Sequence, residues 1–173
     1  TGINFAFDKI ERTPNTLNAH RLIRWAASTG RQHEVAESLF SRYFQRGEDV
    51  GQNYVLLEIA SENEIDTDLV ERLLDSDADV QETRNDDAAA RDLGVAGVPA
   101  FLAGGKFLLM GAQDSDRLTR FFKKADEKHP NKIAQSLRIS VLYHMTNMTI
   151  LDILFLELDK INIFRGPNPP KNI

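Results

Sequence analysis

The stretch that most restricts the fold lies at residues 94–111, where the sequence reads GVAGVPAFLAGGKFLLMG. Two apolar runs, Ala100–Ala103 and Phe107–Met110, flank the dipeptide Gly104-Gly105. A Gly-Gly pair suits the positive φ angles of a tight turn, so the pattern predicts a β-hairpin. Both runs are apolar at consecutive positions, which indicates strands that are covered on both faces.

The sequence before the hairpin has the periodicity of helices, and we expect residues 14–93 to form one all-helical unit. The expected helices cover residues 14–29, 32–46, a short stretch around 55–60, a segment capped by Asp66 or Thr67, and a segment that Asp77 caps and Leu93 ends. Gly30 and Gly47 are expected to end the first two. Residues 1–13 precede this unit as an extended segment, in which Ile3, Phe5 and Phe7 share one buried face.

After the hairpin, Asp114 or Ser115 is expected to cap a helix whose apolar residues recur at helical spacing. These residues are Leu118, Phe121, Phe122 and Ala125. His129-Pro130 would close the helix, so residues 94–129 form a hairpin-plus-helix unit. Residues 130–173 form an extension of different character, with apolar runs at 137–143 and 149–158 that are too short and too charged to span a membrane.

Composition excludes several classes of protein. None of the 173 residues is cysteine, which excludes disulfide scaffolds, cysteine-rich zinc sites and thiol nucleophiles within this chain. The 21 basic and 26 acidic residues give a net charge of −5 and are interspersed along the sequence, so no basic stripe for nucleic acid is expected.

The corner Gly97-Val98-Pro99 is the one local motif with a mechanistic interpretation. A proline just ahead of a strand can adopt the cis form, and the backbone of the residue before it can then pair with an extended peptide. The alternative is an ordinary trans proline that only begins the strand.

Five stretches carry a resemblance to a known family. They are DKIERTPNTLNAHRLIRWAA at 8–27, AESLFSRYF at 36–44, GEDVG at 47–51, VLLEIA at 55–60 and GVAGVPAF at 94–101. In this order and spacing they resemble the DsbA-like thioredoxin-fold family over about residues 1–124. The nearest branch looks like the FrnE-type disulfide oxidoreductases, grouped with 2-hydroxychromene-2-carboxylate isomerase and kappa-class glutathione transferase.

The resemblance implies an α/β protein with a thioredoxin-like fold, interrupted by a large inserted helical domain. It also implies a cytoplasmic protein dithiol–disulfide oxidoreductase or isomerase that acts on extended peptide or protein substrates, without a membrane or nucleic acid. Family members begin with a βαβ unit whose helix carries Cys-x-x-Cys, or a serine in the isomerase and kappa branches. This sequence has no counterpart of that unit, so we expect a truncated chain that is inert in thiol exchange and has neither a catalytic residue nor a cofactor of its own.

Two alternatives stay open. The chain could be a non-catalytic remnant or peptide-binding module, or part of a glutathione-dependent isomerase or transferase. Within the resemblance, Pro99 matches the cis-proline of the family, and Val98, beside Gly97, is the residue whose backbone would pair with the substrate.

The turn after the hairpin matters for the glutathione alternative. Glutathione-binding relatives hold the γ-glutamyl group at a Ser-Asp pair that begins the last helix, and Ser115 and Asp116 resemble that pair. The competing interpretation is that these two residues only cap a helix. Gly111 and Gln113 look like the FrnE-type version of the turn and favour the disulfide branch.

Other polar residues are interpreted as structural. His20 belongs to a family signature, but no second catalytic group is spaced with it, so a structural role is expected. Asp75, Asp77 and Asp79 alternate as in a calcium loop, yet the glycine and the terminal glutamate of such a loop are absent. We therefore expect no metal site.

The strand Ala100–Ala103 would have one unpaired edge without the missing βαβ unit. We predict that residues 137–158 cover this edge by packing on the Ala100–Met110 hairpin, either within one chain or across a homodimer.

Overall fold

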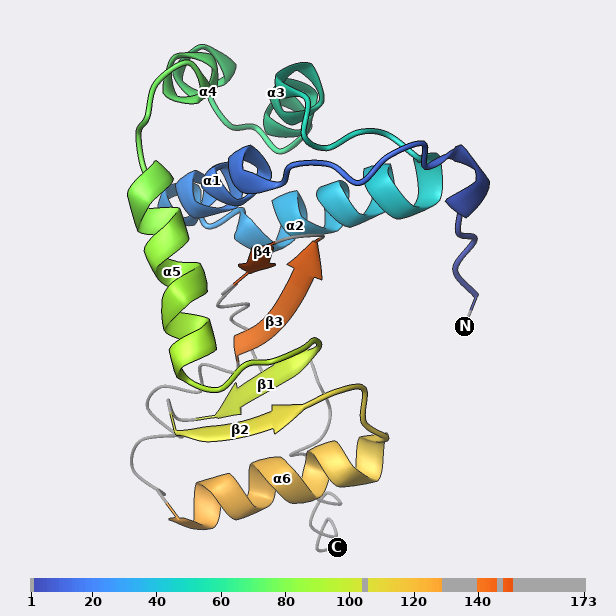
Figure 1. The fold of residues 1–173 in the computed structure, drawn as a ribbon, viewed down its shortest axis with the longest axis vertical. Helices are drawn as coiled ribbons and strands as arrows, with labels where there is room; N and C mark the ends of the chain where they lie inside the picture. Colours follow the sequence, from blue (N-terminus) through green and yellow to red (C-terminus); the bar gives the residue numbers. More distant parts are fainter. Residues whose placement is uncertain (1, 104–105, 129–139, 146–147, 151–173) are drawn as a thin grey trace, which may run out of the picture. The chain divides into compact units, whose positions relative to one another are not determined.

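The computed structural model describes residues 2–103, 106–128, 140–145 and 148–150 (Figure 1). The chain divides into two compact units, one made of Thr1–Gly94 and His144–Leu151 and the other of Val95–Tyr143 and Asp152–Ile173. Each unit has its own cluster of buried apolar side chains. In the described part of the chain, no helix is long and apolar enough to span a membrane.

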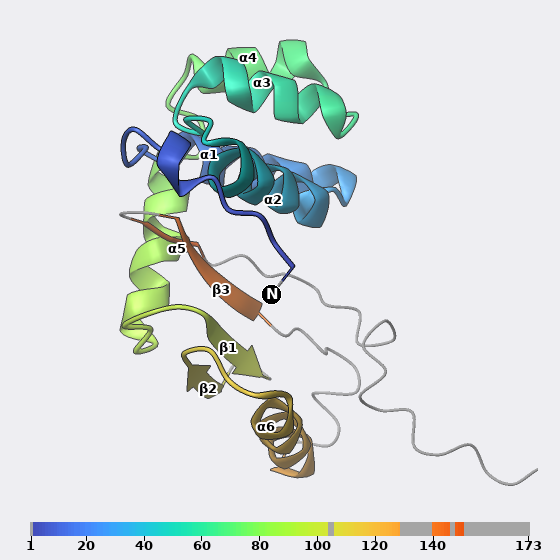
Figure 2. The same cartoon turned by 90° about the vertical axis from the view of Figure 1, so that its right-hand side faces the viewer.

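The first unit is helical, as the periodicity predicts. Its α-helices are α1 (Leu17–Ala26), α2 (Gln32–Phe40), α3 (Asn53–Glu62), α4 (Thr67–Leu74) and α5 (Val80–Asp92), seen in Figures 1 and 2. Short 3₁₀ helices cover Phe7–Lys9 and Ala27–Thr29, a π-helix at Ser41–Arg46 continues α2, and strand β4 (Met148–Ile150) also belongs to this unit. Gly30 and Gly47 end the first two helical stretches with φ angles of 70° and 76°, which confirms both stops.

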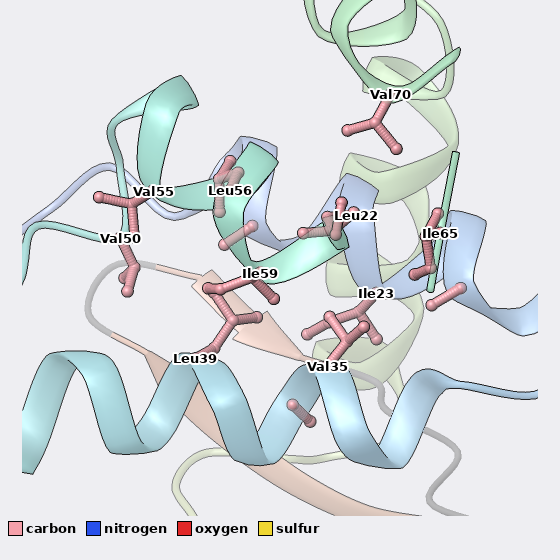
Figure 3. Packing of buried hydrophobic residues seen from close by; sticks show 14 of the residues in the cluster. Leu22, Ile23, Val35, Leu39, Val50, Val55, Leu56, Ile59, Ile65 and Val70 are labelled. Carbon is pink, nitrogen blue, oxygen red and sulfur yellow. The ribbon is translucent and has the colours of Figure 1, made fainter. Parts of the chain in front are cut away.

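Aliphatic side chains from helices α1 to α4 form the core of the first unit, together with Val50 and Ile65 from the loops on either side of α3 (Figure 3). Those with 2% exposure or less include Leu22, Ile23, Val35, Leu39, Val50, Val55, Leu56, Ile59 and Val70. Burial of each contributes about 1.5–3 kcal/mol relative to an exposed position, so this cluster is the main source of the unit's stability.

Arg21 is also buried, with 2% exposure, and joins α1 to the segment between α4 and α5. Its Nε donates to the carbonyl oxygen of Ala78 at 2.8 Å, and its Nη2 donates to the carbonyl oxygens of Ser76, at 2.7 Å, and Leu73. Nη1 donates to Oδ1 of Asn18 at 2.8 Å, and the guanidinium lies 4.9 Å from the centre of the Trp25 ring. The guanidinium therefore satisfies the carbonyl groups of Ser76 and Ala78, which lie beyond the end of α4, and adds a donor to that of Leu73, which also accepts from the N–H and the hydroxyl of Ser76.

Arg42, in the π-helix, is the second buried cation and is 4% exposed. It donates to carboxylate oxygens of Glu48, Glu58 and Glu62 at 2.8, 2.6 and 2.7 Å. Burial by itself would lower the pKa of Arg42, but the hydrogen bonds to Glu58, Glu62 and Glu48 outweigh it and raise the pKa above its usual value. This network ties the π-helix to α3.

The expected burial of Ile3, Phe5 and Phe7 is wrong. These side chains are 49%, 47% and 62% exposed, residues 3–6 form no strand, and Phe7 begins the 3₁₀ helix Phe7–Lys9. The backbone faces the π-helix instead, because the N–H of Ala6 donates to the carbonyl oxygen of Phe44 at 2.8 Å. Alternation indicated that the two faces differ, but it could not show whether either face is covered: of residues 2–7 only Ala6 is buried.

The start of the fifth helix also differs from the expectation. The N-cap of α5 is Asp79 with a φ of 57°, not Asp77, and no side-chain hydrogen bond caps the helix. The Asp79 carboxylate accepts a hydrogen bond from Trp25 Nε1 at 2.8 Å, which draws it away from the helix end. By contrast, Asp66 caps α4 by accepting from the N–H of Leu69 at 3.0 Å, which confirms one of the two expected caps.

The second unit contains the predicted hairpin. Strands β1 (Ala100–Ala103) and β2 (Phe107–Met110) pair antiparallel, with Ala100 opposite Met110 and Ala103 opposite Phe107. Residues 104–105, where the turn was predicted, lie outside the described residues, and so do residues 129–130. Helix α6 (Ser115–Lys128) lies beside the hairpin in both views (Figures 1 and 2). It packs on the hairpin through the predicted side chains. The packed residues include Leu118, Phe121, Phe122 and Ala125.

The other edge of β1 is covered within the chain. Strand β3 (Ser140–Met145) pairs antiparallel with β1, and Leu142, Val141 and Ser140 lie opposite residues 100, 101 and 102. The prediction of a cover by the C-terminal extension is thus confirmed for residues 140–142. Residues 137–139 and 151–158 lie outside the described residues.

Candidate functional site

The corner before β1 has the predicted backbone. The peptide bond between Val98 and Pro99 is cis. Val98 and Pro99 are half-buried and Gly97 is exposed, so the corner is accessible at the end of the hairpin. Neither the N–H nor the C=O of Val98 has a hydrogen bond to another residue that the structure describes. These two groups are therefore available to an extended polypeptide.

The turn after β2 lies directly beside this corner. The N–H of Gly111 donates to the carbonyl oxygen of Pro99 at 2.7 Å, and Gln113 Nε2 donates to the carbonyl oxygen of Met110 at 2.7 Å. Gly111 has a φ of 81°, in the left-handed region that glycine tolerates best. The structure therefore brings the predicted residues of the corner and of the turn together at one end of the hairpin.

Asp114, the first of the two expected candidates, caps α6. Its Oδ1 accepts from the N–H of Arg117 at 2.8 Å, whereas Ser115 and Asp116 are exposed residues of the first helical turn. The hydrogen bond from the Arg117 backbone, followed by the charge of Arg120, lowers the pKa of Asp114 below its usual value. The Asp114 carboxylate thus already accepts a backbone hydrogen bond at the N-terminus of α6, where the γ-glutamyl carboxylate of glutathione would bind.

The other polar residues that the sequence singles out belong to the first unit, whereas the corner and the turn belong to the second. His20 is 6% exposed, and its Nδ1 lies 2.5 Å from the carbonyl oxygen of Thr16, the N-cap residue of α1, which fits the expected structural role. Asp79 interacts with Trp25 and lies 3.4 Å from Arg24. Among the described residues, no group of three or more His, Cys, Asp or Glu side chains could hold a metal ion.

The first unit also contains a cleft that the sequence does not indicate. It has a volume of about 420 Å³ and is lined by Lys9, Glu11, Arg12, Tyr43, Gly47, Glu48, Asp49, Gln52 and Tyr54. A Cβ at Gly47 would collide with Lys9, so a glycine is needed where the N-terminal segment crosses the π-helix. Tyr43 follows the apolar row of its helix, and no sequence signal shows that its surroundings form a cleft.

Comparison with known proteins identifies the family. Residues 1–123 match the model of the DSBA-like thioredoxin domain, and the chain belongs to this family. A solved structure, that of a probable DsbA oxidoreductase from Streptomyces coelicolor, superposes with a TM-score of 0.63 at 26% sequence identity. The match covers 66% of this chain and 50% of that chain, so this chain spans about half the length of its relative. No curated protein matches.

Proposed function

We propose that this chain is the substrate-binding part of a FrnE-type protein dithiol–disulfide oxidoreductase or isomerase of the DsbA-like family, acting in the cytoplasm. The observation that carries the proposal is the corner at Val98, whose backbone groups are available beside the Gly111 turn. An extended segment of a substrate protein would pair with the N–H and C=O of Val98, as in strand addition to a sheet edge.

The thiol step itself cannot use residues of this sequence. Thiol–disulfide exchange begins when a thiolate attacks one sulfur of a disulfide and the other sulfur leaves as a thiolate. The chain has no cysteine, and the thioether of methionine cannot take either role. In this proposal the chain positions the polypeptide, and sulfur atoms from outside this sequence exchange.

The second candidate function is a peptide-binding module without redox activity, which the cysteine-free composition favours. A glutathione-dependent function has less support, because Asp114 already caps the helix at which Ser115 and Asp116 were expected to bind glutathione. Titration with glutathione is therefore expected to leave the amide signals of residues 111–117 unchanged.

The proposal is tested by peptide binding to the full chain. The probe is the alkylated insulin B chain, an extended polypeptide that cannot form mixed disulfides. We expect its addition to shift the amide signals of residues 97–99 and 111–113, and Val98→Pro, which removes the N–H donor, to weaken binding about tenfold, the factor of one hydrogen bond.

The matched control is Ala96→Pro, which removes an exposed N–H two residues earlier. It should leave binding unchanged. If the peptide does not bind, or if both variants bind it as the unchanged chain does, the corner is not the substrate site.

A further inference from the structure

One face of α6 carries a row of cations. Arg117, Arg120, Lys124 and Lys128 are all exposed and follow each other at three- and four-residue spacing, which places them along one side of the helix. We call these four residues the basic row. It extends over 12 residues, from Arg117 to Lys128, and its two ends are about 16 Å apart along the helix. Their guanidinium and ammonium groups form no ion pair with a described residue.

The helical unit carries a complementary row along α4 and its C-cap residue, Asp75. Asp68, Glu71 and Asp75 are exposed, follow the same i, i+3, i+7 spacing as Arg117, Arg120 and Lys124, and likewise form no ion pair with a described residue. We call them the acidic row. Equal spacing lets two helices placed side by side bring each carboxylate opposite a cation.

The charges of the whole chain are divided in the same way. Residues 1–94 contain 10 basic and 19 acidic side chains, 10 − 19 = −9, whereas residues 95–173 contain 11 basic and 7 acidic, 11 − 7 = +4. The alternation of charges along the sequence hides this division, which is why no basic stripe was expected. A nucleic acid or anionic membrane would meet the repulsion of the strongly acidic part, whereas a second copy offers both signs.

We propose that the basic row on α6 of one copy docks on the acidic row on α4 of a second copy. The contact is head to tail, because each copy contributes a different surface, so mass can increase beyond a dimer as concentration rises. Exposed ion pairs are weak and screened by salt, so the association is reversible and strongest at low ionic strength.

The test measures the mass of the full chain by sedimentation equilibrium. At about 20 mM salt we expect a mass above the monomer value of 19.5 kDa that increases with concentration, and at about 500 mM salt the monomer alone. The variants Arg120→Glu with Lys124→Glu, and Glu71→Lys with Asp75→Lys, should each weaken association tenfold or more. A mixture of the two variants should associate again, because each reversed row then meets a reversed partner.

The control variant is Lys106→Glu with Lys123→Glu, which makes the same charge change at two exposed positions outside the basic row. It should associate like the unchanged chain, and circular dichroism should show that all variants are folded. A chain that is monomeric at low salt refutes the proposal, even if it binds a polyanion. So does association that survives both reversals, or a mixture that stays monomeric.

Discussion

Replacement of Arg21 by alanine is expected to lower the free energy of unfolding of the helical unit by about 4 kcal/mol. The side chain is 2% exposed and donates to Asn18 and to the carbonyl groups of Leu73, Ser76 and Ala78. A polar group left buried without its partner costs about 1–3 kcal/mol. The carbonyl groups of Ser76 and Ala78 would lose theirs, whereas that of Leu73 keeps the N–H and the hydroxyl of Ser76. Two such losses amount to about 2–6 kcal/mol, and the middle of this range is about 4 kcal/mol.

Burial lowers the pKa of Arg21, and the nearby carboxylates of Asp79 and Asp77 act in the opposite direction. The guanidinium keeps its charge at neutral pH, since an arginine is effectively always protonated. Lysine at this position keeps the charge but has a single ammonium nitrogen in place of the planar guanidinium with its several N–H donors. Arg21→Lys should therefore lower the free energy of unfolding by about 2 kcal/mol.

The assay is urea unfolding of the full chain, followed by circular dichroism at 222 nm. With a slope of about 2 kcal/mol per molar urea, the alanine variant should unfold at a urea concentration lower by about 2 M. The control is Arg24→Ala on the same helix, where the side chain is 41% exposed and pairs with Asp79 and Asp86 on the surface. Its expected loss is below about 1 kcal/mol. If Arg21→Ala costs no more than Arg24→Ala, the buried guanidinium does not join the helices as we infer.

Three further predictions concern the second unit and the missing thiol. The purified chain should show no insulin reduction or disulfide isomerisation above the uncatalysed rate, because it has no sulfur nucleophile, and activity retained after repurification would refute this. Asp114→Ala should destabilise α6, as measured by amide exchange at residues 115–118. The pKa of Asp114 in the folded chain lies below its usual value, so the cap stabilises α6 fully at pH values above the ordinary pKa of aspartate. This stabilisation is lost as the pH falls through the lowered pKa. An effect of Asp114→Ala that does not depend on pH would contradict this role. Deletion of residues 131–173 should give aggregated protein, because the β1 edge loses its pairing with β3, and a soluble, cooperatively folding monomer would show that the edge needs no cover.

The elements that the sequence predicted well are those with local signals. The hairpin follows from two apolar runs around a Gly-Gly pair, and α4 from a capping Asp66 ahead of apolar residues at helical spacing. Gly47 ends a helical stretch because it adopts a positive φ at low energy. In each case the residues that determine the structure lie within a few positions of one another.

The elements that the sequence could not predict depend on distant partners. Arg21 can be buried because carbonyl groups more than 50 positions away accept its hydrogen bonds. The residues beside Arg21 in the sequence do not indicate these acceptors. The same holds for Asp79, whose carboxylate binds Trp25, 54 positions away. A helical pattern identifies an apolar face, but the partners of a buried polar group depend on tertiary packing.

The candidate site belongs to the predictable part because the hairpin register creates it. Ala100 lies opposite Met110, so the residues just before β1 and just after β2 must meet, and the hydrogen bond from Gly111 to Pro99 follows from that register. A slip of one residue between the two strands would turn either Phe101 or Phe107 away from α6 and would separate Gly111 from Pro99. The apolar contacts on α6 therefore also hold the corner in place, so substitutions at Phe107, which does not belong to the corner, are expected to alter peptide binding at Val98.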